Sequence, residues 1–398
     1  MRVLHVVPSF WPAVRYGGPV RTVLELCVHL RRAGVDVRVA TTDADGDGDL
    51  AVPTDRWVDV QGVPVRYFRR RPRTRFTVSP ELARYVAREA GSFDVLHITS
   101  LFSFPSLVAA RVAAWKQVPY IVSPRGSLMP AARHFRGWKK VPYWWAIERR
   151  NLTRAAAIHA TSRAEADAIR EMVPSVPILL APNGVSLPEE DRRVSVNTHR
   201  LVFLGRIHPL KGFDLLVPAV SRLAQRMPDV ELVIAGPDDE NHRPAVEQLI
   251  RAQVPQPRVT WIGPVEGTRK TELLAGAGVV VLPSKTENFG QVVVEALAVG
   301  TPVVASDRTP WEVLEKAGAG RWLPRDAEAW SRALAEILTD AALRQQMSAA
   351  ARQLARRFSW PAVAAVVAKG YEDVRAGRRV ESEGPGSGSD AAQVGSRR

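Results

Sequence analysis

Short apolar runs alternate with amphipathic helical stretches along nearly the whole chain, and this alternation restricts the fold more than any other feature. The first runs are RVLHVV and DVRVATT, with the helical stretch PVRTVLELCVHLRRAG between them. The same order returns from FDVLHIT onward. Strands that alternate with helices build a mostly parallel sheet with helices on its faces. The sequence therefore predicts an α/β fold.

The pattern restarts after a polar stretch at residues 188–200, where LVFLGRI begins a second series of strands. A chain of 398 residues is too long for one ordinary core. We therefore predict two Rossmann-like, doubly wound domains, a last helix that packs back on the first domain, and a tail that lacks apolar residues to bury. The predicted ranges are 1–187 for the N-terminal domain, 188–359 for the C-terminal domain, 360–376 for the helix and 377–398 for the disordered tail.

The composition narrows the classes of function. The formal net charge of +14 favours a polyanionic partner, and nucleic acid, an acidic membrane surface or a phosphorylated small molecule would each satisfy it. The single cysteine, Cys27, excludes a disulfide framework and fits a reducing compartment. The chain has no apolar run long enough for a membrane span, and MRVLHVVPSF indicates a first strand rather than a signal peptide. The expected location is the cytoplasm.

A loop of the second half carries residues suited to phosphate. Gly205, Arg206 and Lys211 lie in the first strand–helix connection of this half, GRIHPLKG. Glycine allows close backbone approach, a helix N-terminus favours anions, and arginine and lysine bind phosphate oxygens, so together they suit a diphosphate. The alternative is that both cations are ordinary solvated loop residues. The spacing of a Walker A motif is absent.

A second segment, SKTENFGQVVVEALAVG, places Glu287 in a loop and Glu295 in the second turn of an apolar helix. Burying an ionised carboxylate without partners is costly, so Glu295 must reach hydrogen-bond donors. The hydroxyls of a ribose would serve, and so would a nearby arginine or lysine. The sequence leaves both interpretations open, together with a third in which Glu295 faces solvent.

Six motifs occur in a fixed order over nearly the whole chain: GGPVR, SPRGSLMP, APNGV, GRIHPLKG, ENFGQVVVEALAVGTPVV and FSW. The spacing of Glu287 and Glu295 alone, E-x7-E, has little specificity, but the ordered set is specific. The set resembles the retaining glycosyltransferases of family GT4, which have the GT-B fold of two Rossmann-like domains facing each other across a cleft. The resemblance is closest to bacterial enzymes that build exopolysaccharide or lipopolysaccharide chains.

The resemblance implies a donor site in the second domain. Arg206 and Lys211 match the pair that holds the donor diphosphate and stabilises its charge as it leaves. Glu287 matches the glutamate that contacts the donor sugar, and Glu295 matches the glutamate that holds the ribose diol. Further donor-binding positions implied by the resemblance are Gly17, Gly18, Gly205, Val265, Asn288, Phe289 and Gly290.

The implied activity is transfer of a sugar, with retention, from a nucleotide-diphosphate sugar to a glycan or lipid-linked acceptor in cell-surface polysaccharide biosynthesis. No cofactor is expected, and the resemblance implies metal-independent chemistry. A nucleotide-sugar 2-epimerase, an isomerase of related fold, is the alternative enzyme. Nucleic acid is not expected as a partner, because no standard motif for it is present.

The acceptor side departs from the family pattern. Many members have a histidine at the end of the strand that reads PYIVS here, whereas this chain continues with Arg125 and Gly126. An arginine cannot accept a proton, but it could bind acceptor or donor oxygens. His97 is a further acceptor-side candidate, with a structural role in its strand as the alternative.

The segment 132–154 mixes basic and aromatic residues densely. Tryptophan and tyrosine favour membrane interfaces, and arginine and lysine favour anionic headgroups. One interpretation is a surface that docks on the inner face of the cell membrane and meets a lipid-linked acceptor. The other is a packed helix with an ordinary solvated face.

Overall fold

The computed structural model of the 398-residue chain describes residues 1–16, 18–72, 74, 76–130, 132, 141–188, 194–254 and 259–380. The chain divides into two compact units. Unit 1 comprises Met1–Gly184 and the C-terminal segment from Trp360, and unit 2 comprises Val185–Ser359. The division lies close to the predicted boundary between residues 187 and 188. Of the predicted tail, residues 381–398 lie outside the described residues.

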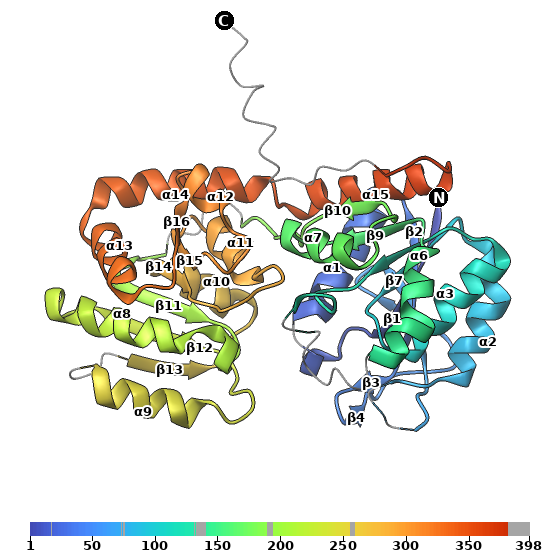
Figure 1. Ribbon diagram of the computed structural model, residues 1–398, viewed down its shortest axis with the longest axis horizontal. Coiled ribbons are helices and arrows are strands. Elements are labelled where there is room, and N and C mark those ends of the chain that lie inside the picture. The colour runs from blue at the N-terminus through green and yellow to red at the C-terminus, as the bar shows by residue number, and fades with distance from the viewer. Residues whose placement is uncertain are drawn as a thin grey trace, which may run out of the picture. The chain divides into compact units, whose positions relative to one another are not determined.

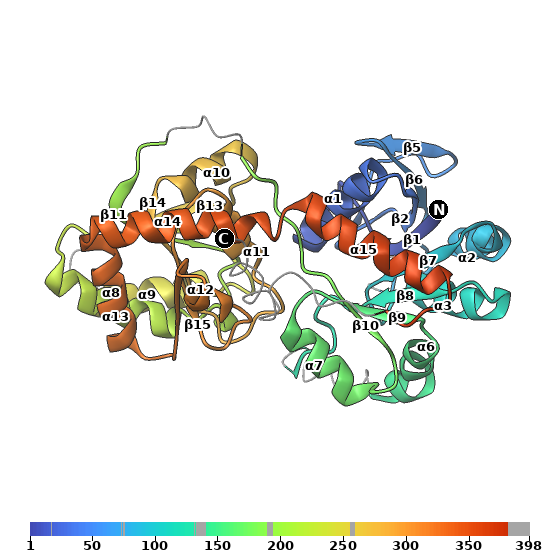
Figure 2. The ribbon, with the colours of Figure 1, turned by 90° about the horizontal axis from the view of Figure 1, so that it is seen from above.

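Unit 1, whose elements are coloured mainly blue to green in Figure 1, is built on a sheet whose described strands follow the order β10-β9-β8-β7-β1-β2-β6-β5 (Figure 2). Neighbouring strands run parallel except β5 and β6. The strands are β1 (Arg2–Ser9), β2 (Asp36–Thr42), β5 (Trp57–Val60), β6 (Val63–Phe68), β7 (Val95–Thr99), β8 (Tyr120–Ser123), β9 (Ala157–Ala160) and β10 (Ile178–Leu180), with the hairpin β3 (Ala44–Asp45) and β4 (Gly48–Asp49) apart from the sheet.

The helices of unit 1 cover both faces of this sheet. They are α1 (Gly18–Arg32), α2 (Pro80–Glu89), α3 (Phe104–Lys116), α6 (Arg149–Thr153), α7 (Arg163–Met172) and α15 (Trp360–Arg375), with the short 3₁₀ turns η1 (Val14–Tyr16) and η2 (Ala90–Ser92) and the π-helix η3 (Trp144–Glu148). Serine side chains cap α2, α3 and α7 by accepting from backbone amides of the first turn, and the capping residues are Ser79, Ser103 and Ser162.

The C-terminal helix α15 belongs to the core of unit 1. Figure 2 shows it beside α1, and its residues Val363, Val367 and Tyr371 are at most 1% exposed. They pack into one cluster with the apolar face of α1. The predicted helix 360–376 therefore forms and packs on the N-terminal domain.

Unit 2 has a fully parallel sheet whose described strands follow the order β13-β12-β11-β14-β15-β16. Counted along the chain this order is 3-2-1-4-5-6, the arrangement of a doubly wound Rossmann sheet. The strands are β11 (Asn197–Leu204), β12 (Glu231–Ala235), β13 (Val259–Gly263), β14 (Ala277–Leu282), β15 (Val303–Ser306) and β16 (Gly320–Leu323). The predicted α/β fold with two Rossmann-like units is confirmed.

Seven helices of at least four residues are described in unit 2: α8 (Phe213–Arg226), α9 (Arg243–Gln253), α10 (Gly267–Ala275), α11 (Gln291–Ala298), α12 (Val313–Lys316), α13 (Ala327–Thr339) and α14 (Ala341–Arg356), with the 3₁₀ turn η4 (Pro209–Lys211). Separate apolar clusters fill the two faces of the sheet. Within the described parts of both units, no helix has the length and apolar character needed to cross a membrane.

Candidate active site

The strand order of unit 2 reverses between β11 and β14, and the loops after these two strands carry most of the predicted donor residues. Ligands of open α/β sheets bind outside the carboxyl ends of the strands at such a point. Gly205 and Arg206 follow β11, whereas Glu287 follows β14. The backbone N–H of Lys285 donates to the carbonyl of Leu210 at 2.8 Å and joins the two loops.

Glycine is required where these loops cross. Gly212 has a φ of +79°, and a Cβ on it would lie 2.0 Å from the carbonyl oxygen of Pro283. No other residue type fits that close approach of two backbones. Gly212, the last residue of GRIHPLKG, therefore lets the segment with Lys211 lie directly against the end of β14.

Lys211 and Glu287 contact each other at this crossing. The Lys211 ammonium donates to Oε1 of Glu287, which also accepts from the hydroxyl of Ser284 at 2.9 Å. The side chains of Lys211 and Glu287 are 19% and 12% exposed. The structure thus brings together Lys211, predicted to bind the diphosphate, and Glu287, predicted to bind the sugar, as an ion pair.

Arg206 is paired too, with a residue that the sequence did not single out. Its Nη1 lies 2.5 Å from Oδ2 of Asp239, and the two side chains are 63% and 31% exposed. Backbone hydrogen bonds fasten the Asp239 loop to the end of β11, from Ile207 N–H to Pro237 O at 2.9 Å and from Asp239 N–H to Ile207 O at 3.1 Å. The pairing depends on this tertiary contact and leaves no mark in local sequence.

The loop after β14 ends at Gly290, which begins α11 with a φ of +82°. Phe289 before it is 6% exposed and packs against Trp311, with ring centroids 5.2 Å apart, while the Trp311 N–H donates to the Phe289 carbonyl. This anchor fixes the start of α11. Asn288, Phe289 and Gly290 are thereby held at the carboxyl edge of the sheet, as a role for their backbone amides requires.

Glu295 lies on the solvent-facing stripe of α11. Residues 292–294 and 296–298 are buried, whereas Gln291, Glu295 and Val299 are partly exposed. Oε1 of Glu295 lies 2.7 Å from the ammonium of Lys270 on α10, and the two side chains are 20% and 21% exposed. The carboxylate therefore meets a lysine, one of the partners that the sequence left open. Lys270 was missed because nothing in its own helix marks it.

Val265 precedes α10 and is 8% exposed. The connection from β13 to α10, which contains Val265, leads directly into the helix that carries Lys270. Across the described residues of both units, no group of three or more His, Cys, Asp or Glu side chains is arranged to hold a metal ion. At the carboxyl edge of the unit 2 sheet, the predicted donor residues Arg206, Lys211, Glu287 and Glu295 thus stand in three cation–carboxylate pairs.

In unit 1, Arg125 and Gly126 follow β8 in left-handed conformations, with φ of 52° and 81°. The Arg125 guanidinium donates from Nη1 to Oδ1 of Asn183 at 2.6 Å, and its buried Nε has no hydrogen-bond partner. The Gly126 N–H donates to the fully buried carboxylate of Glu165. Burial lowers the pKa of Arg125. The loop is therefore held in place, and the buried Nε–H of Arg125 is left without an acceptor.

Of the two interpretations of His97, the structure supports the structural role in its strand over the acceptor-side role. It is 0% exposed, and its Nδ1 accepts from the Tyr371 hydroxyl at 2.6 Å. Its Nε2 lies 3.4 Å from Nδ1 of His159, whose own Nε2 donates to the Ala181 carbonyl at 2.8 Å. His5 stacks on the ring at 4.4 Å. Burial holds the histidine pKa values well below 6.5, so His97 belongs to a neutral polar core.

The aromatic and basic segment 132–154 is described at residues 132 and 141–154. Trp145 and Val141 are 66% and 55% exposed, and the Arg149 guanidinium lies 5.4 Å from the Trp145 ring centroid. Glu148 faces the other way. It is 2% exposed and accepts from the Phe102 N–H at 2.6 Å, and burial raises its pKa to about 7. No pattern in the sequence marked this buried acid.

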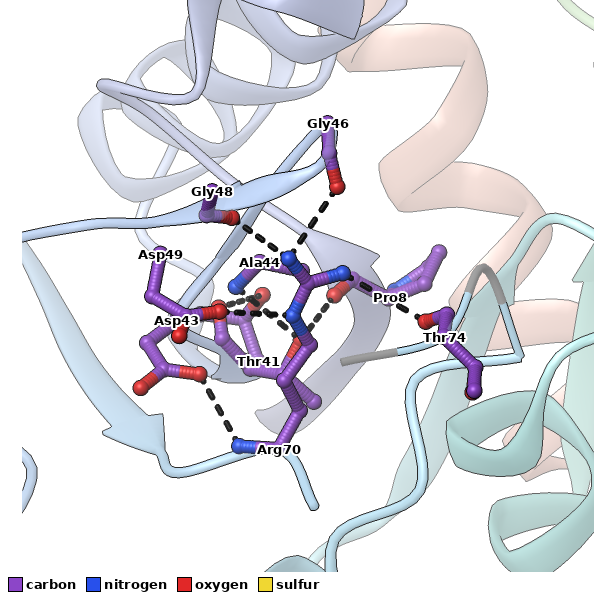
Figure 3. Close-up of polar contacts among 10 residues, drawn as sticks. Pro8, Thr41, Asp43, Ala44, Gly46, Gly48, Asp49, Arg70 and Thr74 are labelled. Atoms are coloured by element: carbon purple, nitrogen blue, oxygen red, sulfur yellow. Dashed lines mark hydrogen bonds and ion pairs between the residues drawn. The ribbon is translucent and has the colours of Figure 1, made fainter. Parts of the chain in front are cut away.

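Of the glycine loop, Gly17 lies outside the described residues and Gly18 begins α1. Arg15, just before it, is held by Asp45 of the β3–β4 hairpin, with Nε 3.7 Å from Oδ2. Figure 3 shows how Arg70 fastens that hairpin. Its side chain is 1% exposed, pairs with Asp49 at 2.7 Å, and donates to the carbonyls of Gly46 and Gly48.

Comparisons with known proteins agree with this geometry. Residues 17–184 match the family described as "Glycosyl transferase 4-like domain", and residues 189–354 match "Glycosyl transferases group 1". The chain is 30% identical to a phosphatidyl-myo-inositol mannosyltransferase of Mycolicibacterium smegmatis, over 94% of this chain and 95% of that protein. It is 31% identical to a D-inositol 3-phosphate glycosyltransferase of Corynebacterium glutamicum, over 55% of each.

Solved structures give the fold. A sucrose-phosphate synthase from Thermosynechococcus elongatus matches with a TM-score of 0.73 at 21% identity, over 94% of this chain and 100% of that one. Alr3699/HepE of Anabaena, solved with UDP and glucose, matches with a TM-score of 0.68 at 20% identity, over 94% and 100%. Together with the matching families and the full-length relative, these likenesses show that the chain is an enzyme that belongs to the GT4 family of glycosyltransferases and has the GT-B fold.

Proposed function

We propose that this glycosyltransferase moves a sugar, with retention, from a nucleoside-diphosphate sugar to a hydroxyl of a lipid-linked or glycan acceptor. The observation that carries the proposal is the meeting of Lys211 and Glu287 at the point where the strand order reverses, with Arg206 in the same connection as Lys211. Cations there suit a leaving diphosphate, and a carboxylate there suits sugar hydroxyls. The relatives named for phosphatidylinositol and inositol phosphate favour a polyol headgroup as acceptor over an exopolysaccharide chain.

The proposed reaction breaks the bond from sugar C1 to the diphosphate oxygen while the acceptor oxygen forms its bond on the same face. The bonding electrons leave with the diphosphate, where Arg206 and Lys211 stabilise the growing charge. The acceptor proton passes to the leaving phosphate. Since Arg206 and Lys211 are paired with Asp239 and Glu287, the diphosphate competes with these carboxylates. Glu287, released from Lys211, then accepts hydrogen bonds from the sugar.

Arg125 is proposed to bind an oxygen of the acceptor or the donor sugar. Its buried Nε–H has no hydrogen-bond partner, and its Nη1 is already held by Asn183. This fixed orientation supports a binding role rather than proton transfer, which arginine cannot perform.

The test is a transfer assay with a panel of nucleoside-diphosphate sugars and inositol-containing acceptors, with the anomeric configuration of the product read by NMR. Glu287→Ala should abolish transfer and preserve nucleotide binding, whereas Glu295→Ala should weaken nucleotide binding. Glu312→Ala removes an exposed pair with Lys316 and serves as the control. Full activity of both site variants would contradict the proposal.

Incubation with donor alone tests for an isomerase, which would change the sugar without any acceptor.

We propose further that the segment 141–154 docks on an anionic membrane. Trp145 and Val141 are exposed hydrophobic residues beside the basic Arg149 and Arg150, a combination that suits a charged lipid interface. The variant Trp145→Ala/Arg149→Ala should lose co-sedimentation with vesicles containing phosphatidylglycerol. Val196→Ala/Arg251→Ala, which changes an exposed hydrophobic residue and a surface arginine in unit 2, should bind as before. Equal binding of both variants would refute the docking surface.

A further inference from the structure

The carboxylate of Glu295 is held by one of its two oxygens. Oε1 accepts from the Lys270 ammonium at 2.7 Å, and Oε2 makes no hydrogen bond to any residue that the structure describes. Lys270 likewise has no other polar partner among the described side chains. One oxygen is therefore fixed, and the other is left on the solvent-facing stripe of α11.

The two residues lie on neighbouring helices, each of which follows a different strand of the sheet. Lys270 belongs to α10, which follows β13 and Val265, and Glu295 belongs to α11, which follows β14. The helices pack against each other. The ion pair thus joins the helix that follows the predicted donor-binding residue Val265 to the helix that carries the predicted ribose ligand Glu295.

An unpaired glutamate on a helix surface samples several rotamers, and a ligand that requires one of them must order it. A partner that already holds the side chain in that rotamer removes the loss of conformational entropy on binding. From this geometry we propose that Lys270 is a positioning residue, which holds Oε1 of Glu295 so that Oε2 is presented to the ribose hydroxyls of the donor. The inference rests on the proposed function, since it takes a ribonucleotide as the ligand.

Two other roles for Lys270 would give different results. A lysine that bound the diphosphate directly would support every nucleoside diphosphate, with or without ribose hydroxyls. A lysine that served only the packing of α10 on α11 would lower thermal stability and leave no dependence on the sugar of the nucleotide. A pair of ligands that differ only in the 2′- and 3′-hydroxyls therefore separates the three roles.

The experiment measures binding by calorimetry for UDP, GDP and their 2′,3′-dideoxy forms, with the full chain and the variants Lys270→Met, Lys270→Arg and Glu295→Gln. Lys270→Met should weaken the ribonucleotide by about three- to tenfold, the range expected for ordering one side chain, and leave the dideoxy form unchanged. Lys270→Arg should restore most of the loss. The double variant Lys270→Met/Glu295→Gln should bind no more weakly than Glu295→Gln alone, because Lys270 acts through Glu295.

Lys316→Met is the matched control, since it removes another Lys–Glu pair of unit 2, at 2.8 Å from Glu312. Equal losses for the ribo and dideoxy forms, or no loss with Lys270→Met while Glu295→Gln still weakens UDP or GDP, would overturn the positioning role. If Glu295→Gln bound both forms as tightly as the unchanged chain, or if the unchanged chain bound neither nucleotide, the proposed function itself would fail.

Discussion

At the scale of single residues, the predicted donor residues at the carboxyl edge of the unit 2 sheet have their charges held in internal pairs. Arg206 meets Asp239, Lys211 meets Glu287, and Lys270 meets Glu295. Pairs exposed to solvent contribute about 0–1 kcal/mol each, so a multivalent anion can displace a carboxylate at small expense. We expect the exposed pair of Arg206 to exchange most easily, because its arginine is 63% exposed.

Asp239→Asn should tighten the binding of a nucleoside diphosphate by about two- to fivefold at low salt, because it removes a competitor for Arg206 that contributes up to about 1 kcal/mol. Calorimetric titration at two salt concentrations checks this, and the gain should shrink at the higher one. Asp307→Asn, which changes a carboxylate beside Arg308, is the control. Weaker binding by Asp239→Asn would mean that Asp239 orients Arg206 instead of competing for it.

The sequence could indicate which residue types serve the site but not how they are paired. Arg206, Lys211, Glu287 and Glu295 stand in motifs whose order along the chain is visible. Their partners Asp239 and Lys270 come from loops and helices that tertiary packing brings near, and no local pattern records that approach.

At the scale of elements, the strands and main helices could be predicted from the sequence, because buried strands appear as short apolar runs and amphipathic helices have a regular hydrophobic periodicity. The β3–β4 hairpin was not, because Arg70, which fastens it, lies beyond the next pair of strands. The π-helix Trp144–Glu148 could not be predicted either, because it too depends on a contact with a distant segment. Its last residue turns inward to a backbone amide on the loop after β7, a contact that local periodicity cannot encode.

Glu148 should make stability depend on pH. Its pKa rises on folding from 4.5 to about 7, so the folded chain binds a proton that the unfolded chain releases across that interval. The stabilisation is complete below about pH 4.5 and is lost as the pH rises through about 7, by about 3 kcal/mol at most. Glu148→Gln keeps an acceptor for the Phe102 N–H but cannot ionise. Its free energy of unfolding relative to the unchanged chain should therefore rise between pH 5 and 8.

Denaturant unfolding at several pH values measures this difference. Glu89→Gln, a change on the partly exposed end of α2, should leave the pH profile unaltered. Parallel profiles for Glu148→Gln and the unchanged chain would show that Glu148 has the same pKa in both states.

At the scale of the whole molecule, the two units should respond differently to acid. His5, His97 and His159 all belong to unit 1, and burial lowers the pKa values of His5 and His159 to about 3 and that of His97 well below 6.5. Unfolding lets each bind a proton below pH 6.5, so this part of the stability is lost as the pH falls. At pH 5 the loss is about 2 kcal/mol for His5 and about 2 kcal/mol for His159, and His97 adds to it, so the histidines together exceed the opposite contribution of Glu148.

We therefore expect acidification from pH 7 to pH 5 to destabilise unit 1 and to affect unit 2 far less. Hydrogen exchange followed by mass spectrometry, corrected for the intrinsic effect of pH, reports on each unit through its own peptides. Protection should fall first in peptides from β1, β7 and β9. Equal loss of protection in both units would contradict a special role for the buried histidines.

The return of α15 to unit 1 has a consequence for how the protein is made. Unit 2 is one continuous stretch, Val185–Ser359, and all of its strands leave the ribosome before α15 does. Unit 1 begins first but buries Val363, Val367 and Tyr371 from the last helix, and Tyr371 donates the hydrogen bond that satisfies His97. The domain translated first is thus the one completed last, and until residue 375 emerges the apolar face of α1 lacks its cover.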